Sequence, residues 1–290
     1  MKITGHTQVY CVLGTPIAHS RSPLMHNTAF EALGMDCVYT AFDVAEHQMD
    51  AAVAGLRQLG VRGWNITMPD KHRMAQLCDQ LSPAARLIGA VNTVCNQDGI
   101  LTGHNTDGVG FMLAARDAGV DLRGKKLTIL GVGGASTAIY VQAALDGASE
   151  LSLFNRQSPS LEQARPLIRQ LEKETGCHIG LYDLADEERL AQEISTSAAL
   201  VNGTSMGMSP HPERCPLPRA ELLPSGLLVY DVIYEPLTTR LLAMARQRGC
   251  IPVNGLGMLL WQGAEAFRLW TGQDMPIQAV KQAVFPELLT

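Results

Sequence analysis

The chain has 290 residues, of which 46% are hydrophobic and 18% are charged, as in a globular protein of about two domains. Its net charge of −5 comes from 28 acidic and 23 basic residues that are scattered along the chain, which argues against a nucleic-acid or membrane-surface partner. A small molecule is therefore the expected partner.

The first third of the chain alternates short β-branched segments with helical patterns, which predicts βαβ units and a parallel sheet. The strand patterns are "VYCVLG", "CVYTAFDV" and "RGWNITM". Helices are expected over 23–33 and near 46–59, with two short helices after the third strand. The segment 90–108 breaks the alternation, because Gln-Asp-Gly at 97–99 lies between two short apolar runs and predicts a hairpin turn. A first domain is expected to end here.

A second alternating pattern starts at Leu127 and predicts another parallel sheet with helical crossovers. Its strand patterns are "LTILG", "LSLFNR", "HIGLYDL", "AALVNGTS", "GLLVYDV" and "IPVNGLG". A long polar helix is expected near 159–174, and the Pro-rich segment 208–218 predicts a surface loop. The helical pattern that begins with "GMLLWQGAEAF" is expected to return to the first domain.

No run of about 18 apolar residues marks a membrane span, and the N-terminal segment lacks the apolar run of a signal peptide, so a cytoplasmic location is expected. The seven cysteines are dispersed without a CxxC pair. The eight histidines lack the spacing of a metal site. We therefore expect reduced, mostly buried cysteines and no metal.

Gly131, Gly133 and Gly134 lie between a strand pattern and a helix pattern in "LTILGVGGAST", the context that a dinucleotide or another phosphate-bearing ligand needs. Glycines let the backbone approach a phosphate, and the following helix N-terminus directs N–H groups at the anion. A tight strand-to-helix turn without a ligand has the same spacing. The surrounding βαβ pattern favours ligand binding.

The cofactor that this loop would hold depends on the residues about 20 positions further on, where an acid holds the ribose of NAD and a base accommodates the 2′-phosphate of NADP. Here Asn155 and Arg156 take that place, and the first acid, Glu162, lies within the next predicted helix. Arg156 favours NADP over NAD, although a solvated surface charge is the alternative interpretation. The missing acid also argues against a methyltransferase.

Two hydroxyls of the first domain, Ser20 and Ser22, precede Pro23. Ser22 is expected to be the N-cap of the helix that follows, with proline at its first position. Capping does not explain Ser20, and the two hydroxyls together are suited to binding a substrate carboxylate.

Asn65 and Thr67 alternate with apolar residues at the C-terminal end of a predicted parallel strand, where open α/β sheets bind ligands. Asn92 and the segment 105–107 (Asn-Thr-Asp) occupy comparable positions. Each alone is most simply a turn residue, but together they predict a site for a polyol. Lys71, at the first turn of a short helix, is either a solvated lysine or a functional cation.

Six motifs in this order, over nearly the whole chain, resemble the shikimate/quinate dehydrogenases: "HSRSP", "NITMPDK", "GAVNTV", "GHNTDG", "GVGGAST" and "GMLLWQGAEAF". The resemblance implies an NAD(P)-dependent exchange of a ring hydroxyl and a ketone between shikimate and 3-dehydroshikimate, with quinate and 3-dehydroquinate as a second pair. It implies that Ser20 and Ser22 bind the carboxylate and that Lys71 and Asp107 are the catalytic pair.

The same resemblance implies substrate contacts at Asn65, Thr67, Asn92, Thr106, Asp107 and Gln262. It implies cofactor contacts at Gly131, Gly133, Gly134, Ala135, Asn155, Arg156, Ser205, Val232 and Gly255. The nucleotide motif departs from the family pattern, because Gln157 follows Arg156 and Ser158 stands where members that accept NAD often have an acid. NADP and NAD both stay open as cofactors, with NADP favoured.

We therefore expect an α/β protein of two domains. Residues 1–107 with 258–290 would form an α/β substrate domain with a mainly parallel sheet, and 108–257 a Rossmann-type, doubly wound dinucleotide-binding domain. The partner would be shikimate or quinate, with no nucleic acid or membrane, in a monomer or a homodimer. A regulatory protein that senses a dinucleotide or shikimate on the same fold is the alternative, and another two-domain dehydrogenase, such as one acting on a folate, is a third.

Overall fold

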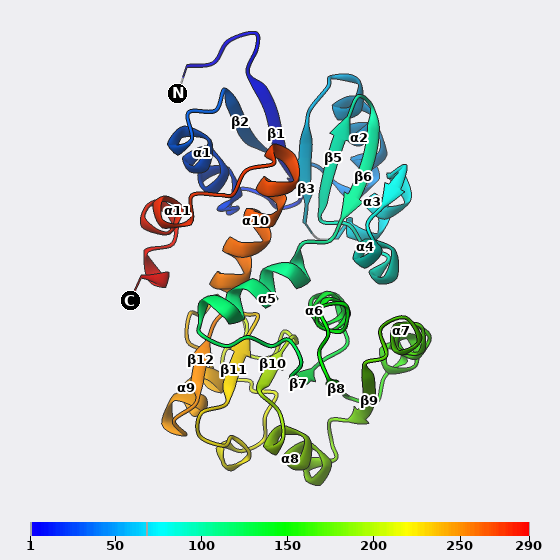
Figure 1. The fold of residues 1–290 in the computed structure, drawn as a ribbon, viewed down its shortest axis with the longest axis vertical. Helices are drawn as coiled ribbons and strands as arrows, with labels where there is room; N and C mark the ends of the chain where they lie inside the picture. Colours follow the sequence, from blue (N-terminus) through cyan, green and yellow to red (C-terminus); the bar gives the residue numbers. More distant parts are fainter. Residues whose placement is uncertain (1, 68, 290) are drawn as a thin grey trace. The chain divides into compact units, whose positions relative to one another are not determined.

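The structure is a computed structural model that describes residues 2–67 and 69–289. The chain forms two compact units, Met1–Thr106 with Leu260–Thr290, and Asp107–Leu259 (Figure 1). Both units are mixed α/β, which confirms the predicted fold class. Met68, which the third predicted strand includes, lies outside the described residues.

The elements of the first unit follow the predicted alternation of strands and helices. They are β1 (Gln8–Gly14), α1 (Ser22–Ala32), β2 (Cys37–Asp43), η1 (Glu46–Gln48), α2 (Met49–Gln58), β3 (Gly63–Ile66), α3 (Lys71–Leu77), β4 (Gln80–Leu81), α4 (Pro83–Ile88), β5 (Thr93–Gln97), β6 (Ile100–His104), α11 (Ile277–Val284) and η3 (Pro286–Leu288). Helix α10 (Leu256–Thr271) crosses the boundary between the units.

The sheet of the first unit has the order β2-β1-β3-β5-β6-β4. Strand β1 runs parallel to β2 and β3, and β4 runs parallel to β6. The predicted hairpin adds the antiparallel pairs β3–β5 and β5–β6. Its turn contains Asp98 and Gly99, whose φ angles of 52° and 86° suit a tight hairpin turn.

A group of packed aromatic rings fixes the C-terminal part of α10 on this sheet. The indole N–H of Trp270 donates a hydrogen bond to the Val94 carbonyl at 2.9 Å, and the Trp270 ring lies 5.2 Å from that of Tyr10. Gly63, at the start of β3, has no side chain, and a Cβ there would lie 2.3 Å from Trp270 Nε1. The glycine thus makes room for the indole on the sheet.

The second unit alternates strands and helices throughout. Its elements are α5 (Asp107–Asp117), β7 (Lys126–Leu130), α6 (Gly134–Leu145), β8 (Glu150–Asn155), α7 (Pro159–Thr175), β9 (His178–Asp183), α8 (Glu187–Ser195), β10 (Ala199–Asn202), η2 (Ala220–Leu222), β11 (Leu228–Asp231), α9 (Arg240–Gln247) and β12 (Ile251–Val253). The Pro-rich segment 208–218 is mostly exposed, as predicted, although Leu217 is buried in the core.

The sheet of the second unit has the order β12-β11-β10-β7-β8-β9, with every neighbouring pair parallel. The chain winds outward from β7 to β9, returns to the centre, and winds outward again from β10 to β12. This is the doubly wound Rossmann order, and its switch point lies between β7 and β10. Ligands bind at the carboxyl ends of the strands in such sheets.

At the N-terminal ends of β7 and β8, opposite to the ends where such sheets bind ligands, a buried carboxylate connects both strands to α8. Glu193 is 5% exposed. Its Oε2 accepts a hydrogen bond from the Ser152 hydroxyl at 2.6 Å and lies 2.5 Å from Lys126 Nζ. Its Oε1 pairs with Arg189 Nε at 3.0 Å. The charge of Glu193 is therefore compensated on both oxygens, as a buried carboxylate requires.

The structure also bears on membrane spans, metal ligands and the state of the cysteines. Within 2–67 and 69–289, no helix is both long and apolar enough to cross a membrane. Over the same residues, no three His, Cys, Asp or Glu side chains are grouped so as to hold a metal ion. The seven cysteines are free, and five of them are buried.

Candidate functional site

Ser20 and Ser22 lie on the turn that leads into α1. The prediction that Ser22 is the N-cap is wrong, because the helix begins at Ser22, its N-cap position is Arg21, and no side chain caps it. Ser20 has the local role instead, since its Oγ accepts a hydrogen bond from the Ser22 backbone N–H at 3.3 Å. Both serines are half-buried, so both are accessible to a ligand.

The side chain of Arg21 anchors this serine turn to the C-terminal segment of the same unit. Its guanidinium pairs with Glu287 Oε1 at 3.2 Å and lies 5.7 Å from the centre of the Phe285 ring. A long side chain that is fixed at its far end restrains the backbone from which it starts. Arg21 therefore limits the motion of the two serines.

Asn65 lies at the C-terminal end of β3 and is 7% exposed. Its amide nitrogen donates hydrogen bonds to the Asn92 carbonyl at 3.1 Å and to Thr93 Oγ1 at 3.0 Å. Its amide oxygen accepts a hydrogen bond of 2.6 Å from the hydroxyl of Tyr39. Thr67 follows on the same edge, next to Gly14, where a Cβ would lie 2.2 Å from Thr67 Cγ2.

Asn92 connects this strand end to two other segments. Its Oδ1 accepts a hydrogen bond from the Thr106 N–H at 2.8 Å, and its Nδ2 donates one to Gln262 Oε1 at 3.4 Å. The structure thus brings together four residues that were predicted from separate motifs. They are Asn65, Asn92, Thr106 and Gln262.

Lys71 is the first residue of α3 and is half-buried. Its backbone carbonyl accepts a hydrogen bond from the Val91 N–H at 2.9 Å, which fixes the start of α3 beside the residue before Asn92. Asp107 is the first residue of α5 and of the second unit. The acid–base pairing of Lys71 with Asp107 stays a prediction.

The glycine loop of the second unit follows β7 at the switch point of the sheet. Gly131 has a φ angle of 100°, which side chains disfavour, and a Cβ there would lie 2.9 Å from Thr204 Cγ2. The loops after β7 and β10 can therefore pack closely. Gly133 and Gly134 are exposed, with no atom within 4 Å of where a Cβ would stand, so the N-terminus of α6 is open to a phosphate.

Asp231, at the end of β11, holds together the loops that carry two of the predicted cofactor residues, Ser205 and Val232. It is completely buried and accepts hydrogen bonds from Thr239 Oγ1 at 2.7 Å, from Asn202 Nδ2 at 3.0 Å and from the backbone N–H of Ile233 at 3.2 Å. Burial raises the pKa of this carboxyl to about 6.

Asn202 extends the contacts of Asp231 to the loop after β10, since its Oδ1 accepts hydrogen bonds from both the N–H and the hydroxyl of Thr204. Asn202 and Asp231 were not predicted from the sequence, although each is the polar last residue of an apolar strand. Gly255 is packed closely against the loop after β11. A Cβ at this position would lie 2.0 Å from the Val232 carbonyl oxygen. A larger residue at 255 would therefore displace this loop.

The loop after β8 is ordered by its own side chains. Asn155 Nδ2 donates hydrogen bonds to the Arg156 carbonyl at 2.9 Å and to Ser158 Oγ at 3.1 Å. The guanidinium of Arg156 is exposed. Gln157 Nε2 donates a hydrogen bond to Asp183 Oδ2 at 2.9 Å, so an acid from the end of β9 reaches this loop. Asp183 was not predicted from the sequence, because the acid that holds the ribose was expected after β8 and not at the end of β9.

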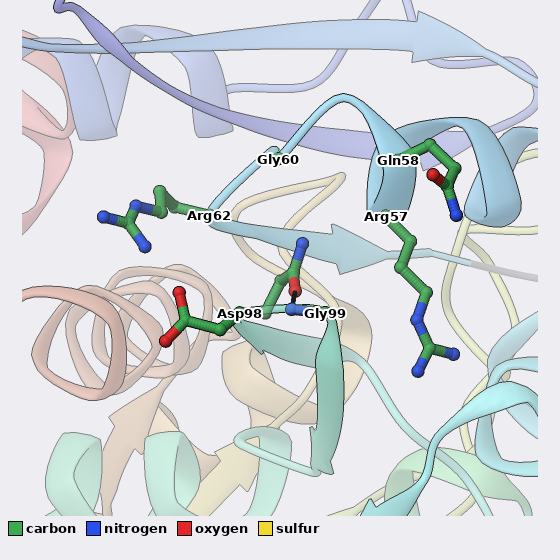
Figure 2. Close-up of a pocket in the computed structure, with 7 residues that line it drawn as sticks. Arg57, Gln58, Gly60, Arg62, Asp98 and Gly99 are labelled. Carbon is green, nitrogen blue, oxygen red and sulfur yellow. Dashed lines mark hydrogen bonds between the residues drawn. The ribbon is translucent and has the colours of Figure 1, made fainter.

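A pocket of about 340 Å³ is lined by none of these residues and lies in the first unit, at the end of β3 opposite to Asn65. Figure 2 shows its two arginines, Arg57 and Arg62, pointing in different directions, with Arg62 on the same side as Asp98. Arg57 is paired with Asp79 at 2.9 Å. The two cations therefore do not converge on one ligand, and this pocket contributes nothing to the candidate site.

Comparison with known families identifies two segments of the chain. Residues 12–94 match the shikimate dehydrogenase substrate binding domain, and residues 255–285 match the shikimate 5′-dehydrogenase C-terminal domain. Over 284 residues the chain is 49% identical to a shikimate dehydrogenase (NADP(+)) from Listeria monocytogenes, which covers 98% of both chains.

Two solved structures show the same fold. The crystal structure of shikimate 5-dehydrogenase from Listeria monocytogenes, in complex with shikimate and NAD, has a TM-score of 0.93 and 48% identity and covers 97% of this chain and 98% of that one. A quinate dehydrogenase from Corynebacterium glutamicum, in complex with NAD, has a TM-score of 0.83 and 28% identity and covers 96% and 98%.

Proposed function

The chain belongs to the shikimate dehydrogenase family, and from this premise we propose that it interconverts 3-dehydroshikimate and shikimate by hydride transfer with NADP or NAD. It is an NAD(P)-dependent oxidoreductase. The observation that carries the choice of substrate is the hydrogen-bonded cluster of Asn65, Asn92, Thr106 and Gln262. These amide and hydroxyl groups supply the donors and acceptors that a polyhydroxylated ring needs.

In this proposal the first unit binds the substrate. Ser20 and Ser22 donate hydrogen bonds to the carboxylate from their half-buried turn. Thr67 and the cluster contact the ring hydroxyls, with the Asn65 position fixed by its bonds to Asn92 and Thr93. Neutral donors suit a substrate whose carboxylate keeps its charge, because they add no second charge to be desolvated.

The second unit is proposed to bind the cofactor, which supplies the hydride in ketone reduction and accepts it in alcohol oxidation. The open loop at Gly133 and Gly134 would hold the pyrophosphate at the N-terminus of α6. The loops that Asp231 ties together would flank the nicotinamide through Ser205 and Val232. Ala135 and Gly255 are the remaining residues that we assign to this site.

Lys71 is proposed to transfer the proton. In ketone reduction its ammonium gives a proton to the carbonyl oxygen as the hydride reaches the carbonyl carbon, so that a hydroxyl forms without a free alkoxide. In oxidation the neutral amine takes the hydroxyl proton. Asp107, the second member of the proposed catalytic pair, would orient the ring hydroxyl for this proton transfer. A positioned group of this kind contributes about 10²–10⁴ in rate.

Arg156 is proposed to favour NADP, because it is an exposed cation on the loop after β8, and a base on this loop accommodates the 2′-phosphate in dinucleotide-binding domains. Quinate is the second candidate substrate, supported by the likeness to a quinate dehydrogenase of the same fold. The presence of both Lys71 and Asp107 favours an enzyme over a regulatory protein that only senses these ligands. The monomeric or dimeric state and the cytoplasmic location stay predictions.

Initial rates with shikimate and quinate, each with NADP and with NAD, test the proposal. We expect the highest kcat/KM for shikimate with NADP. Absence of reduced cofactor with shikimate under all conditions would overturn the proposed reaction. Binding of shikimate without turnover would support the regulatory alternative, and a higher kcat/KM for quinate would reassign the substrate.

A further inference from the structure

We propose that Tyr39 is a positioning residue for the substrate, which fixes the amide of Asn65 through its hydroxyl. This inference rests on the proposed function, because it deepens the description of the same substrate site. Tyr39 lies on β2, and neither the sequence motifs nor the family resemblance selected it.

The hydroxyl of Tyr39 is directed at a predicted substrate residue. It is buried, with the residue 2% exposed, and it donates a hydrogen bond of 2.6 Å to Asn65 Oδ1. Tyr39 lies on β2 and Asn65 on β3, so this bond ties the amide of Asn65 to a second strand of the sheet.

These bonds define what Asn65 can offer to a ligand. The amide nitrogen has two N–H groups, and both are used within the protein, by the Asn92 carbonyl and by Thr93 Oγ1. The amide oxygen has two lone pairs, of which Tyr39 occupies one. The second lone pair of the Asn65 oxygen can therefore accept a hydrogen bond from a ring hydroxyl of the substrate. The Tyr39 hydroxyl keeps the amide in this orientation.

The ring of Tyr39 is held independently of its hydroxyl. It stacks on His26 with 4.4 Å between ring centres and an interplanar angle of 19°. The side chain of Asn27 bonds both the carbonyl and the N–H of Tyr39, each at 2.8 Å. Removal of the hydroxyl should therefore leave the ring and β2 in place, so Tyr39→Phe tests the hydrogen bond alone.

Tyr10 offers a matched control in the same aromatic group. It is also 2% exposed, and its ring lies 5.2 Å from Trp270, which contacts Tyr39 as well. Its hydroxyl, however, bonds Gln8 Oε1 at 3.3 Å and none of the proposed substrate residues. Tyr10→Phe makes the same chemical change in the same surroundings without touching Asn65.

Steady-state kinetics of the full chain test the proposal. Loss of one neutral hydrogen bond that positions a binding group should raise the KM for shikimate about 2- to 12-fold in Tyr39→Phe. The KM for NADP should not change, and kcat should change less than the KM for shikimate. Tyr10→Phe should leave both KM values at their wild-type levels.

A double-mutant cycle separates positioning through Asn65 from a general structural effect. In an Asn65→Ala background, Tyr39→Phe should cause no further rise in the KM for shikimate. An additive effect, an unchanged KM in Tyr39→Phe, or an equal rise in Tyr10→Phe would each overturn the role of Tyr39. If the wild type turns over shikimate and Tyr39→Phe has the same KM for shikimate, only this inference is contradicted. If the wild type is inactive with shikimate, the proposed function is contradicted as well.

Discussion

Arg156 is an exposed cation on the loop after β8, where Asn155 and Ser158 order the backbone. If this guanidinium pairs with a 2′-phosphate, Arg156→Ala should raise the KM for NADP about 10-fold and leave the KM for NAD nearly unchanged. The expected effect lies at the low end for charged hydrogen bonds, because solvent screens an exposed pair. Initial rates with each cofactor at saturating shikimate measure both constants.

Arg165→Ala is the control for this prediction. Arg165 is also exposed and lies on α7, the next helix, but it is paired with Glu162 at 2.9 Å. Its removal should change neither KM. Equal losses for NADP and NAD in Arg156→Ala would show that Arg156 contacts a part common to both cofactors.

The roles of single residues were predicted unevenly from the sequence. Ser20 and Ser22 were found as a pair, but their local roles were reversed, because the pattern Ser-Pro suggests a cap without showing which backbone N–H is bonded. Tyr39 was missed because a tyrosine in an apolar strand looks like core. Asp183 was missed because it comes from a neighbouring strand.

At the scale of elements, the loops after β10 and β11 depend on the ionisation of Asp231. Burial raises the pKa of this carboxyl from 3.8 to about 6. Between these two values the folded protein binds more protons here than the unfolded protein does. The contribution of this group to the free energy of unfolding therefore falls as the pH rises from about 4 to about 6, and it is constant above that.

Asp231→Asn removes this titration while its side-chain oxygen can still accept the bonds from Asn202 and Ile233. The variant should gain stability relative to the wild type as the pH rises from about 4 to about 7, by up to about 3 kcal/mol. Urea denaturation of both proteins across this range measures the difference. A difference that stays constant with pH would contradict the proposed titration of Asp231.

The elements themselves were predicted well where the sequence pattern is long. The central strands of the second unit are buried and rich in apolar residues, for example β10, as parallel strands between two layers of helices should be. The hairpin β5–β6 followed from Asp98 and Gly99. Strand β4 has only two residues, Gln80–Leu81, and no periodicity can reveal so short a strand.

At the scale of the whole molecule, the order of the motifs predicted the fold class and the family. The contacts within the site were less predictable, because they join residues far apart in the chain. Asn92 and Gln262 are 170 positions apart, yet their side chains are hydrogen-bonded. Which donor meets which acceptor depends on the packing of α10 against the sheet, and the sequence pattern does not contain that information.

In the proposed reaction the first unit binds the ring acid, the second unit binds the cofactor, and Lys71 is the proton donor. The most direct measurement is the turnover of shikimate with NADP by Lys71→Met, together with calorimetric binding of each ligand to the same variant. We predict that kcat falls by about 10²–10⁴ while the dissociation constants of shikimate and NADP change little. Near-normal turnover in this variant, with its fold shown to be intact by circular dichroism, would contradict the proposed mechanism.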